Sequence, residues 1–441
     1  MEYFEFNGLL HPNHHGFRNN CNTTTALLQM YDMWIEAMDR GELTGVVFLD
    51  QSAAFDMVNF EILLNKLSVY GFDEKSCSWF KSYLSERSQS VCVDGTCSPL
   101  LPIKSGVPQG SILGPLLYII YTNELPESIC KHQNNEYLST FEIRCQNCGS
   151  ICCFADDSSY SFSSKDDKEI SDMISCKFQS ISEFMASHEL KLNTSKTHLL
   201  LLASDRLRRI RPNLNIGLNT GNEMIEISTS ENLLGGIISQ NLKFSDHIQN
   251  HENSLLRSLN SRLTALKSVC YLTDFATRKM IANGIFISKL VYLIPLWVGS
   301  ENYLINSLQI IQNKAARAVT KCDRETPIPY LLHQCGWLSV AQLGMYHSLV
   351  MAYKVKNSHC PQYLFSKLWD TEKLPYNVRS TTECRIRLGR ASQAVTEMAR
   401  RSFKYRTTQD WNRLPADIRC ANKLETFKVM VKDWIRKNIN I

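Results

Sequence analysis

Two short apolar segments, far apart in the sequence, each run directly into aspartate. Val46 to Leu49 precede Asp50, and Ile151 to Ala155 precede Asp156 and Asp157. Brief apolar runs bounded by turn residues predict buried strands, and the second run continues into another strand, which predicts a hairpin with the two aspartates at its tip. Carboxylates next to buried strands are costly unless they bind a cation or another partner. Each of these acids is therefore a candidate for binding a cation or another partner.

The other periodic segments place helices around this sheet. Helical spacing of apolar residues predicts helices at 24–38, 62–70, 76–84, 111–125, 169–188 and 254–272. Asp94-Gly95 between short β-rich runs predicts a second hairpin, and residues 190–203 are typical of a strand around Lys196. Helices follow to the end of the chain. The sequence thus predicts an α+β first half that passes into a helical second half near residue 250.

Two carboxylates at neighbouring strand ends suit a hard cation. Magnesium prefers one or two carboxylates together with substrate phosphate oxygens, and two such ions can clamp an in-line phosphoryl displacement. An isolated Asp-Asp pair, however, is more often an ordinary turn. The order of the surrounding motifs decides between these interpretations.

Four segments resemble, in order, the motifs of non-LTR (LINE-like, jockey-like) retrotransposon reverse transcriptases. Residues 48–56 (FLDQSAAFD) resemble motif A, 105–115 (SGVPQGSILGP) motif B, 154–157 (FADD) motif C, and 192–197 (LNTSKT) motif D. Further similarity is found around Gly16-Phe17-Arg18, Leu234-Gly235 and Trp411-Asn412. The resemblance therefore covers nearly the whole chain, with a longer spacing between motifs B and C than is common in the family.

The resemblance implies a right-hand polymerase with partial fingers, an antiparallel-sheet palm, a helical thumb and a helical basic C-terminal region. We expect partial fingers at 1–43, and the palm with finger helices, a hairpin and an insertion at 127–149 over 44–203. The palm–thumb connection and thumb follow at 204–272, and the helical C-terminal region at 273–441. The family's basic finger segment and endonuclease domain are expected to be missing, which predicts a truncated element.

The resemblance also implies roles for individual residues. Asp50, Asp156 and Asp157 would hold Mg²⁺ (or Mn²⁺), and Lys196 would stabilise or protonate the leaving pyrophosphate. The nucleotide would meet four other residues, which are Phe55, Gln109, Gly110 and Arg18. Phe55, five residues after Asp50, would exclude a 2′-hydroxyl. The alternative interpretation of Phe55 is a residue that only packs in the core. The alternative interpretation of Lys196 is an exposed lysine on a strand. The implied partners are an RNA template, a DNA primer and deoxynucleoside triphosphates.

The cysteines admit a competing interpretation. Cys145 and Cys148 have zinc-ligand spacing, with Cys152, Cys153 and His132 nearby. Neighbouring residues of a strand point to opposite faces, so Cys152 and Cys153 are not expected to share a ligand. We expect thiols that bind no metal. The 16 cysteines of a chain without a signal-peptide pattern are expected to be reduced and mostly buried.

Charge and hydropathy bound the partners and the compartment. The net charge is +5, but residues 373–441 carry 16 Lys/Arg against 6 Asp/Glu, which predicts a contact with nucleic-acid backbone or, alternatively, a solvated helical surface. The apolar stretch 285–298 contains Lys289 and Pro295, so it predicts a core helix and no membrane span. The protein is expected in the cytoplasm or nucleus, not secreted.

Three functions remain open at this stage. The first is an RNA-directed DNA polymerase, and the second is a catalytically inactive nucleic-acid-binding remnant, which the truncated fingers would favour. The third is a host-adapted reverse transcriptase of the intron-maturase or telomerase type. The motifs around Asp50 and Trp411 fit the non-LTR elements better.

Overall fold

The computed structural model describes residues 1–129, 149–212, 214, 216–220, 224–225, 227–368 and 396–439. The chain divides into two compact units. Unit 1 consists of residues 1–22, 42–202 and 206–228, and unit 2 of residues 23–41, 203–205 and 229–441. Within the described residues, no helix is long and apolar enough to cross a membrane.

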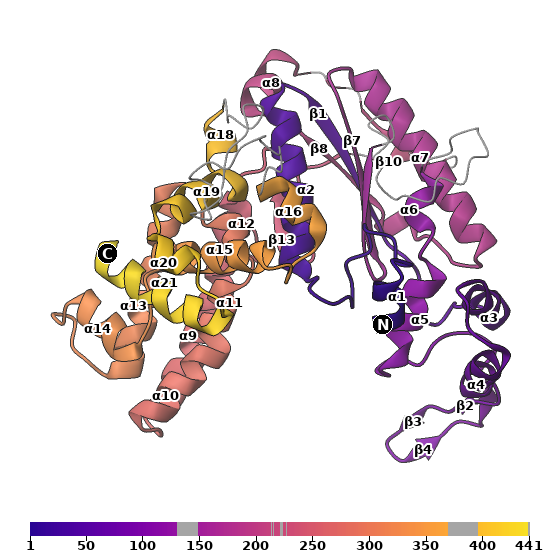
Figure 1. Cartoon of the computed structure of the whole chain (residues 1–441), viewed down its shortest axis with the longest axis horizontal. Coiled ribbons are helices and arrows are strands. Elements are labelled where there is room, and N and C mark those ends of the chain that lie inside the picture. Colours follow the sequence, from indigo (N-terminus) through magenta and orange to yellow (C-terminus); the bar gives the residue numbers. More distant parts are fainter. Residues whose placement is uncertain are drawn as a thin grey trace. The chain divides into compact units, whose positions relative to one another are not determined.

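Unit 1 is built on a five-stranded sheet in the order β11-β8-β1-β7-β6 (Figure 1). Its strands are β1 (Leu43–Leu49), β6 (Ser150–Phe154), β7 (Asp157–Ser164), β8 (His198–Leu202) and β11 (Ile227–Ser228). β1 is fully buried and antiparallel to both β7 and β8, with Leu49 opposite Ser158. The predicted antiparallel sheet is thus found for its first four strands, whereas β11 pairs parallel to β8.

Helix α7 (Asp167–Ser187) covers one face of this sheet (Figure 1). Its buried apolar row begins with Ile170 and Ile174 and continues to Met185. Gly45 on β1 lets the helix approach, because a Cβ there would stand 2.8 Å from the Ile170 side chain. Close packing of this row against the sheet is the main apolar core of unit 1.

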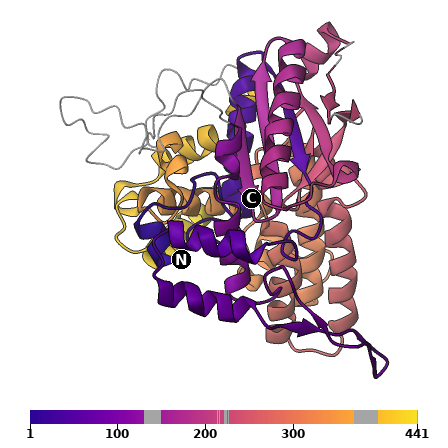
Figure 2. The same ribbon diagram turned by 90° about the vertical axis from the view of Figure 1, so that its right-hand side faces the viewer.

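The chain between β1 and β6 forms helices and a narrow two-stranded arm. The helices are α3 (Phe60–Val69), α4 (Glu74–Leu84), α5 (Leu113–Tyr121) and α6 (Leu125–Ser128), preceded near the N-terminus by α1 (Glu2–Phe6). The arm pairs β2 (Ser88–Gln89) with β5 (Leu101–Pro102), and β3 (Cys92–Val93) with β4 (Thr96–Cys97). Asp94 and Gly95 both have positive φ, as the predicted two-residue hairpin turn requires. The arm projects away from α3 and α4 (Figure 2).

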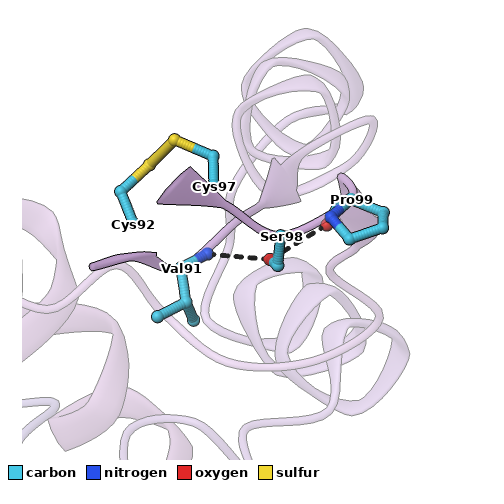
Figure 3. Close-up of a disulfide and its surroundings, with 5 residues drawn as sticks. All are labelled: Val91, Cys92, Cys97, Ser98 and Pro99. Atoms are coloured by element: carbon cyan, nitrogen blue, oxygen red, sulfur yellow. Dashed lines mark hydrogen bonds between the residues drawn. A yellow bond between two sulfur atoms is a disulfide. The ribbon is translucent and has the colours of Figure 1, made fainter. Parts of the chain in front are cut away.

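A disulfide joins Cys92 and Cys97 across the arm (Figure 3). Beside it, Ser98 accepts a hydrogen bond from the Val91 amide and donates one to the Pro99 carbonyl. The prediction of reduced thiols is therefore wrong for this pair. The prediction that the thiols are mostly buried is also wrong, because only four of the ten free cysteines among the described residues are buried. Cys130, Cys145 and Cys148, His132 and most of the predicted 127–149 insertion lie outside the described residues.

Unit 1 is completed by η1 (Thr194–Lys196), a single 3₁₀ turn before β8, by a short hairpin of β9 (Leu218–Asn219) and β10 (Met224–Ile225), and by the greater part of α8 (Asp205–Ile210). The predicted strand around Lys196 is wrong at its start, because that residue ends the 3₁₀ turn and the strand begins at His198.

Unit 2 is mainly helical. It contains α2 (Thr23–Asp39), the hairpin of β12 (Ser230–Leu233) and β13 (Gly236–Ser239), and a helical array. The array comprises η2 (Asp246–Asn250), α9 (Leu255–Val269), α10 (Phe275–Ala282), η3 (Asn283–Ile287), α11 (Ser288–Val291), α12 (Ile294–Trp297), α13 (Asn302–Thr320), α14 (Ile328–Cys335), α15 (Val340–Lys356), α16 (Gln362–Leu368), α18 (Glu397–Arg400), α19 (Phe403–Arg413), α20 (Ala416–Arg419) and α21 (Leu424–Asn438). The predicted change to helical structure near residue 250 is confirmed. The predicted core helix over 285–298 is buried at several positions but is interrupted before α12, where Leu293 has φ of 56°.

Aromatic residues form the core at the C-terminal end of unit 2. Trp411 on α19 is fully buried and lies 5.7 Å from Phe427 on α21, measured between ring centroids. Phe427 in turn stacks on Tyr353 of α15 at 4.4 Å. The Trp411 segment noted in the sequence is thus a packing element that joins three helices.

Candidate active site

The strand register brings the three predicted acids to one end of the sheet. Asp50 directly follows β1, whose last residue pairs with Ser158 of β7. Asp156 lies in the turn between β6 and β7, and Asp157 begins β7. Ala155 has φ of 56°, which turns the chain sharply enough for a two-residue connection between paired strands. Adjacent antiparallel strands therefore carry the acids.

The electrostatics show that these carboxyl groups are neighbours. Burial raises the pKa of Asp157, and the negative charges of Asp156 and Asp50 raise it further. Among the described residues no basic group forms an ion pair with any of the three. Like charges gathered in this way destabilise one another unless a proton or a cation compensates them.

The donor chemistry of this set fits a hard divalent cation. Carboxylate oxygens that leave room for phosphate oxygens are what Mg²⁺ takes in proteins. Within the described part of the chain, no group of three His, Cys, Asp or Glu side chains is already arranged as a metal site. As they stand, Asp50, Asp156 and Asp157 form an open set that does not by itself make a metal site.

A hydrogen-bonded path connects the hairpin to the segment that follows β1. Gln51 donates from Nε2 to the Asp156 carbonyl at 3.2 Å, and Tyr118 on α5 donates to Gln51 Oε1 at 2.6 Å. Burial and the Asp156 charge raise the pKa of Tyr118, so the phenol stays a donor. This path fixes the two acid-bearing segments relative to each other.

Phe55 belongs to the same cluster. It is half-buried and stacks on Tyr118, with ring centroids 4.7 Å apart and an angle of 25° between the rings. The predicted core role and the predicted substrate-facing role both require such a fixed ring. Its partial exposure leaves one side of the ring free of the core.

The glycine-rich loop after the arm is fixed onto the residues that follow Asp50. Gly106 and Val107 donate backbone hydrogen bonds to the Val58 and Phe55 carbonyls, both at 2.8 Å. Gly106 has φ of 95°, and a Cβ there would lie 2.8 Å from the Asp56 Cα, so this close approach requires glycine. The segments that resemble motifs A and B thus form one unit.

Gln109 and Gly110 lie at the exposed end of this loop. Gln109 donates from Nε2 to both carboxylate oxygens of Asp56 at 3.1 Å. Gly110 has φ of 77° and open space on its Cβ side. Both residues are exposed, as a nucleotide contact requires, and their predicted binding role stays a prediction.

Lys196 is held near the acids by its backbone. Asn193 donates from its amide to the Asp50 carbonyl at 2.9 Å, and Lys196 donates to the Asn193 carbonyl at 3.2 Å. The Lys196 side chain is exposed, and no ion pair among the described residues occupies it. The predicted role of Lys196 at the leaving group stays a prediction.

The N-terminal segment supports the hairpin from the other side. His15 donates from its amide to the Cys153 carbonyl at 2.8 Å, and Cys153 donates to the Asn13 carbonyl at 2.9 Å. Arg18, predicted to contact nucleotide or template, makes a two-pronged ion pair with Glu5 at 2.7 and 2.9 Å. It also donates to the His11 and His14 carbonyls at 2.8 and 3.1 Å. In this structure the Arg18 side chain therefore connects Glu5, His11 and His14 within the N-terminal segment.

Gln51 and Tyr118 were not singled out from the sequence. Their hydrogen bond joins residues 67 positions apart, and no local pattern reports such a contact. The one available signal was position, because Gln51 directly follows Asp50. Burial raises the pKa of the Cys153 thiol to about 12 and that of the Cys152 thiol as well; that these thiols bind no metal stays a prediction.

The mixed helix and sheet content, with its acid-bearing hairpin, fits a polymerase fold. The family described as "Reverse transcriptase (RNA-dependent DNA polymerase)" matches residues 2–244. This chain belongs to that family.

The relatives are proteins of mobile elements. The chain is 26% identical over 314 residues to the probable RNA-directed DNA polymerase from transposon BS of Drosophila melanogaster, and 26% identical over 325 residues to that from transposon X-element of the same species. It is 25% identical over 305 residues to the RNA-directed DNA polymerase from mobile element jockey. These matches cover 70%, 73% and 69% of this chain, which spans about a third of each relative (33%, 33% and 31%).

Among solved structures, the chain is similar to telomerase from Candida albicans in complex with a fragment of telomeric RNA. The sequence identity is 12%, and the match covers 76% of this chain and 52% of that one. The TM-score is 0.37, a likeness too low to carry an argument.

Proposed function

We propose that this chain is the polymerase part of a non-LTR retrotransposon protein and that it extends a DNA primer on an RNA template. The observation that carries the proposal is the open set of Asp50, Asp156 and Asp157 at the end of an antiparallel sheet. Burial and the charges of Asp156 and Asp50 raise the pKa of Asp157, and oxygen-rich, phosphate-bearing substrates would complete a cation site there. Family membership supports the same reaction.

The proposed chemistry is nucleotidyl transfer from a deoxynucleoside triphosphate to a primer 3′-hydroxyl. Mg²⁺ (or Mn²⁺), when bound, would acidify that hydroxyl and stabilise charge on the triphosphate. Asp50, Asp156 and Asp157 would hold the cations. The Gln51–Tyr118 path would keep the two acid-bearing segments in register, so that the nucleophile and the phosphate meet at a fixed separation.

The other predicted residues take positions around this centre. Phe55, fixed against Tyr118, would contact the sugar, and the exposed Gln109 and Gly110 would meet the base pair. Lys196 would stabilise the leaving pyrophosphate, and its exposed ammonium is free to reach it. In this arrangement unit 1 supplies the palm and the finger elements, while helices of unit 2 form the thumb and the C-terminal region.

Template RNA would also contact the helical region. Lys279, Lys432 and Arg436 line a cavity of about 420 Å³ together with Trp337 and Tyr346. Arg436 donates to the Gly336 carbonyl at 3.3 Å, and the Lys279 ammonium lies 3.4 Å from where a Cβ on Gly336 would stand. Burial lowers the pKa of Lys432, as do the nearby positive charges of Arg436 and Lys279. Three positively charged side chains at one cavity favour binding of the phosphate backbone of a nucleic acid.

Primer extension on an RNA template with magnesium tests the proposal. Asp156→Asn should lower the extension rate at least about a hundredfold, because a metal-held site supplies several kcal/mol of charge stabilisation. Asp94→Asn is the matched control, since it makes the same change at another hairpin turn and should leave the rate unaltered. Extension by Asp156→Asn at the wild-type rate would refute the assignment. Absence of extension by every variant, with RNA still bound, would show a non-catalytic remnant.

A further inference from the structure

The helix before the arm carries a regular row of basic and aromatic side chains. Lys75, Trp79, Tyr83 and Arg87 are each four residues apart, the first three on α4 and the last just after it. Residues four apart lie on one face of a helix. The row therefore has a cation at each end and two aromatic rings between them.

The two rings form a flat, accessible surface. Trp79 and Tyr83 stack with centroids 5.6 Å apart and only 7° between the ring planes. The Trp79 side chain is 55% exposed, and Tyr83 is partly exposed. Arg87 lies over the Tyr83 ring at 6.0 Å, which continues the stack by one planar group.

The rings lie at the margin of the core, where Trp79 meets Phe80 edge to face with ring centroids 5.1 Å apart. Helix α4 packs through other residues of the same helix, since Leu84 is fully buried and Phe80 contacts Phe72 edge to face at 5.7 Å. Within the described residues, neither Lys75 nor Arg87 forms an ion pair. An exposed tryptophan is uncommon in a surface that serves solvation alone.

We infer that the row of Lys75, Trp79, Tyr83 and Arg87 is a stacking platform for a single nucleic-acid strand, on which unpaired bases lie against the rings and the end cations contact phosphates. Base–aromatic stacking combined with basic residues is the usual way to bind single strands without regard to sequence. The cations at the two ends of the row, Lys75 and Arg87, favour a partner that carries phosphate groups beside its stacked rings. The inference goes beyond the proposed polymerisation and requires no catalysis.

Binding of labelled ten-nucleotide oligo(dT) and oligo(rU) in EDTA tests the platform. Trp79→Ala/Tyr83→Ala should weaken binding of one or both probes at least about tenfold, because each stack is worth roughly 1–3 kcal/mol. Trp79→Phe/Tyr83→Phe should restore most of the affinity. Tyr303→Ala removes a ring of similar exposure (60%) on α13 and should have no effect. The dT and rU arms show whether the strand is DNA, RNA or either.

Two further measurements locate the contact. Lys75→Gln/Arg87→Gln should lower the slope of log affinity against log salt by roughly 1.4, about 0.7 for each lost phosphate contact. Photo-cross-linking of 5-iodouracil oligonucleotides should label the tryptic peptides 76–81 and 82–87. Because EDTA removes the divalent cation that the proposed reaction requires, the binding assay separates this inference from that reaction.

Three results would overturn the inference. One is wild-type affinity in a Trp79→Ala/Tyr83→Ala protein with a native circular dichroism spectrum. Another is cross-linking confined to other peptides. The third is loss of self-association in that variant while oligonucleotide affinity stays unchanged, which would make the row an interface between proteins. Should the double variant fail to fold, the Lys75→Gln/Arg87→Gln salt slope and the cross-links decide.

Discussion

At the scale of single residues, Gly16 is a position beside the acid-bearing hairpin where one added methyl group should be destabilising. A Cβ at Gly16 would lie 2.6 Å from the Ala155 amide nitrogen and 3.0 Å from the Phe154 carbonyl carbon, both backbone atoms of the acid-bearing hairpin. Gly16→Ala should therefore lower the free energy of unfolding by about 1–3 kcal/mol, as overpacking does. It should also reduce primer extension. Urea unfolding and extension assays measure both effects.

Gly284→Ala serves as the control for that change. A Cβ at Gly284 meets nothing within 4 Å, and the residue is helical with ordinary φ. This variant should be neutral or up to about 1 kcal/mol more stable. Equal stability of the two variants would mean that the hairpin moves aside without cost.

Phe55 carries a prediction about sugar selection. Its ring stacks on Tyr118, which would hold it in place beside a bound sugar if Phe55 has the proposed role. Phe55→Ala should raise the use of ribonucleotides relative to deoxynucleotides about tenfold or more, since a lost steric contact changes discrimination by roughly 1–3 kcal/mol. Single-nucleotide incorporation with each substrate measures the ratio. An unchanged ratio with slower extension would assign Phe55 to the core instead.

The acids could be predicted from the sequence, and their supporting contacts could not. Apolar runs ending in Asp50 and in Asp156 are local patterns, and antiparallel pairing of the two strands brings their ends together. The Gln51–Tyr118 hydrogen bond and the Arg18–Glu5 ion pair depend on how separate segments meet. Periodicity along the chain carries no information on such contacts.

At the scale of elements, the histidine-rich segment beside β6 gives unit 1 an acid-sensitive support. Burial lowers the pKa of His14 to about 3, and that of His11 and His15 to about 4 and 3. Each residue thus stays neutral in the folded protein, while an unfolded chain binds a proton near pH 6.5. Stability from these residues is present above about pH 6.5 and is lost as the pH falls toward the folded values.

His14→Gln should reduce this acid sensitivity. His14 makes a hydrogen bond through Nε2 with the Thr122 carbonyl at 3.0 Å, and a glutamine amide can donate to the same carbonyl. Between pH 7 and pH 5 the variant should lose about 2 kcal/mol less unfolding free energy than wild type. Urea titrations across this range measure the difference. His333→Gln, at an exposed site on α14, should lose the same unfolding free energy as wild type between pH 7 and pH 5. The same loss in His14→Gln as in wild type would mean that His14 is protonated in the folded protein.

Elements set by local patterns matched the sequence prediction closely, and elements set by distant partners did not. The predicted helix 24–38 is α2, and the Asp-Gly turn forms as expected because its dihedral angles are a local property. β11 is only two residues long and owes its place to pairing with β8. The break before α12 depends on Leu293 in a left-handed conformation, which its residue type disfavours and tertiary packing enforces.

At the scale of the whole molecule, the compact units cut across the predicted domains. Helix α2 lies in the predicted partial fingers at 1–43, yet it clusters with unit 2. Tyr31 of α2 lies 5.0 Å from the Phe244 ring, and Tyr292 donates to the Thr23 hydroxyl at 3.2 Å. A stretch of sequence corresponds to one domain only where all its residues pack in the same core. Helix α2 does not, because the residues before and after it belong to unit 1 while α2 belongs to unit 2.

Charge distribution over the molecule leads to a prediction about salt. The net charge of +5 conceals a C-terminal excess of basic residues, of which Lys432 and Arg436 converge with Lys279 on one cavity. Replacing all three by glutamine should lower the slope of log RNA affinity against log salt by about 2, since each phosphate contact on a single strand contributes roughly 0.7. Filter binding between about 50 and 200 mM salt covers the range in which such contacts change affinity most.

The control removes the same charge from three cations of unit 2 that each form an ion pair; in the cavity, Arg436 has such a partner in Asp433 at 3.9 Å. Lys243, Lys404 and Lys428 form ion pairs with Asp205, Glu36 and Glu425 at 2.8, 3.7 and 2.7 Å. Their replacement by glutamine should leave the slope nearly unchanged, because a cation neutralised by a carboxylate releases few counterions from RNA. Equal slopes for the two triple variants would show that total charge alone drives binding. A smaller slope only for the cavity variant would place RNA phosphates at these three side chains.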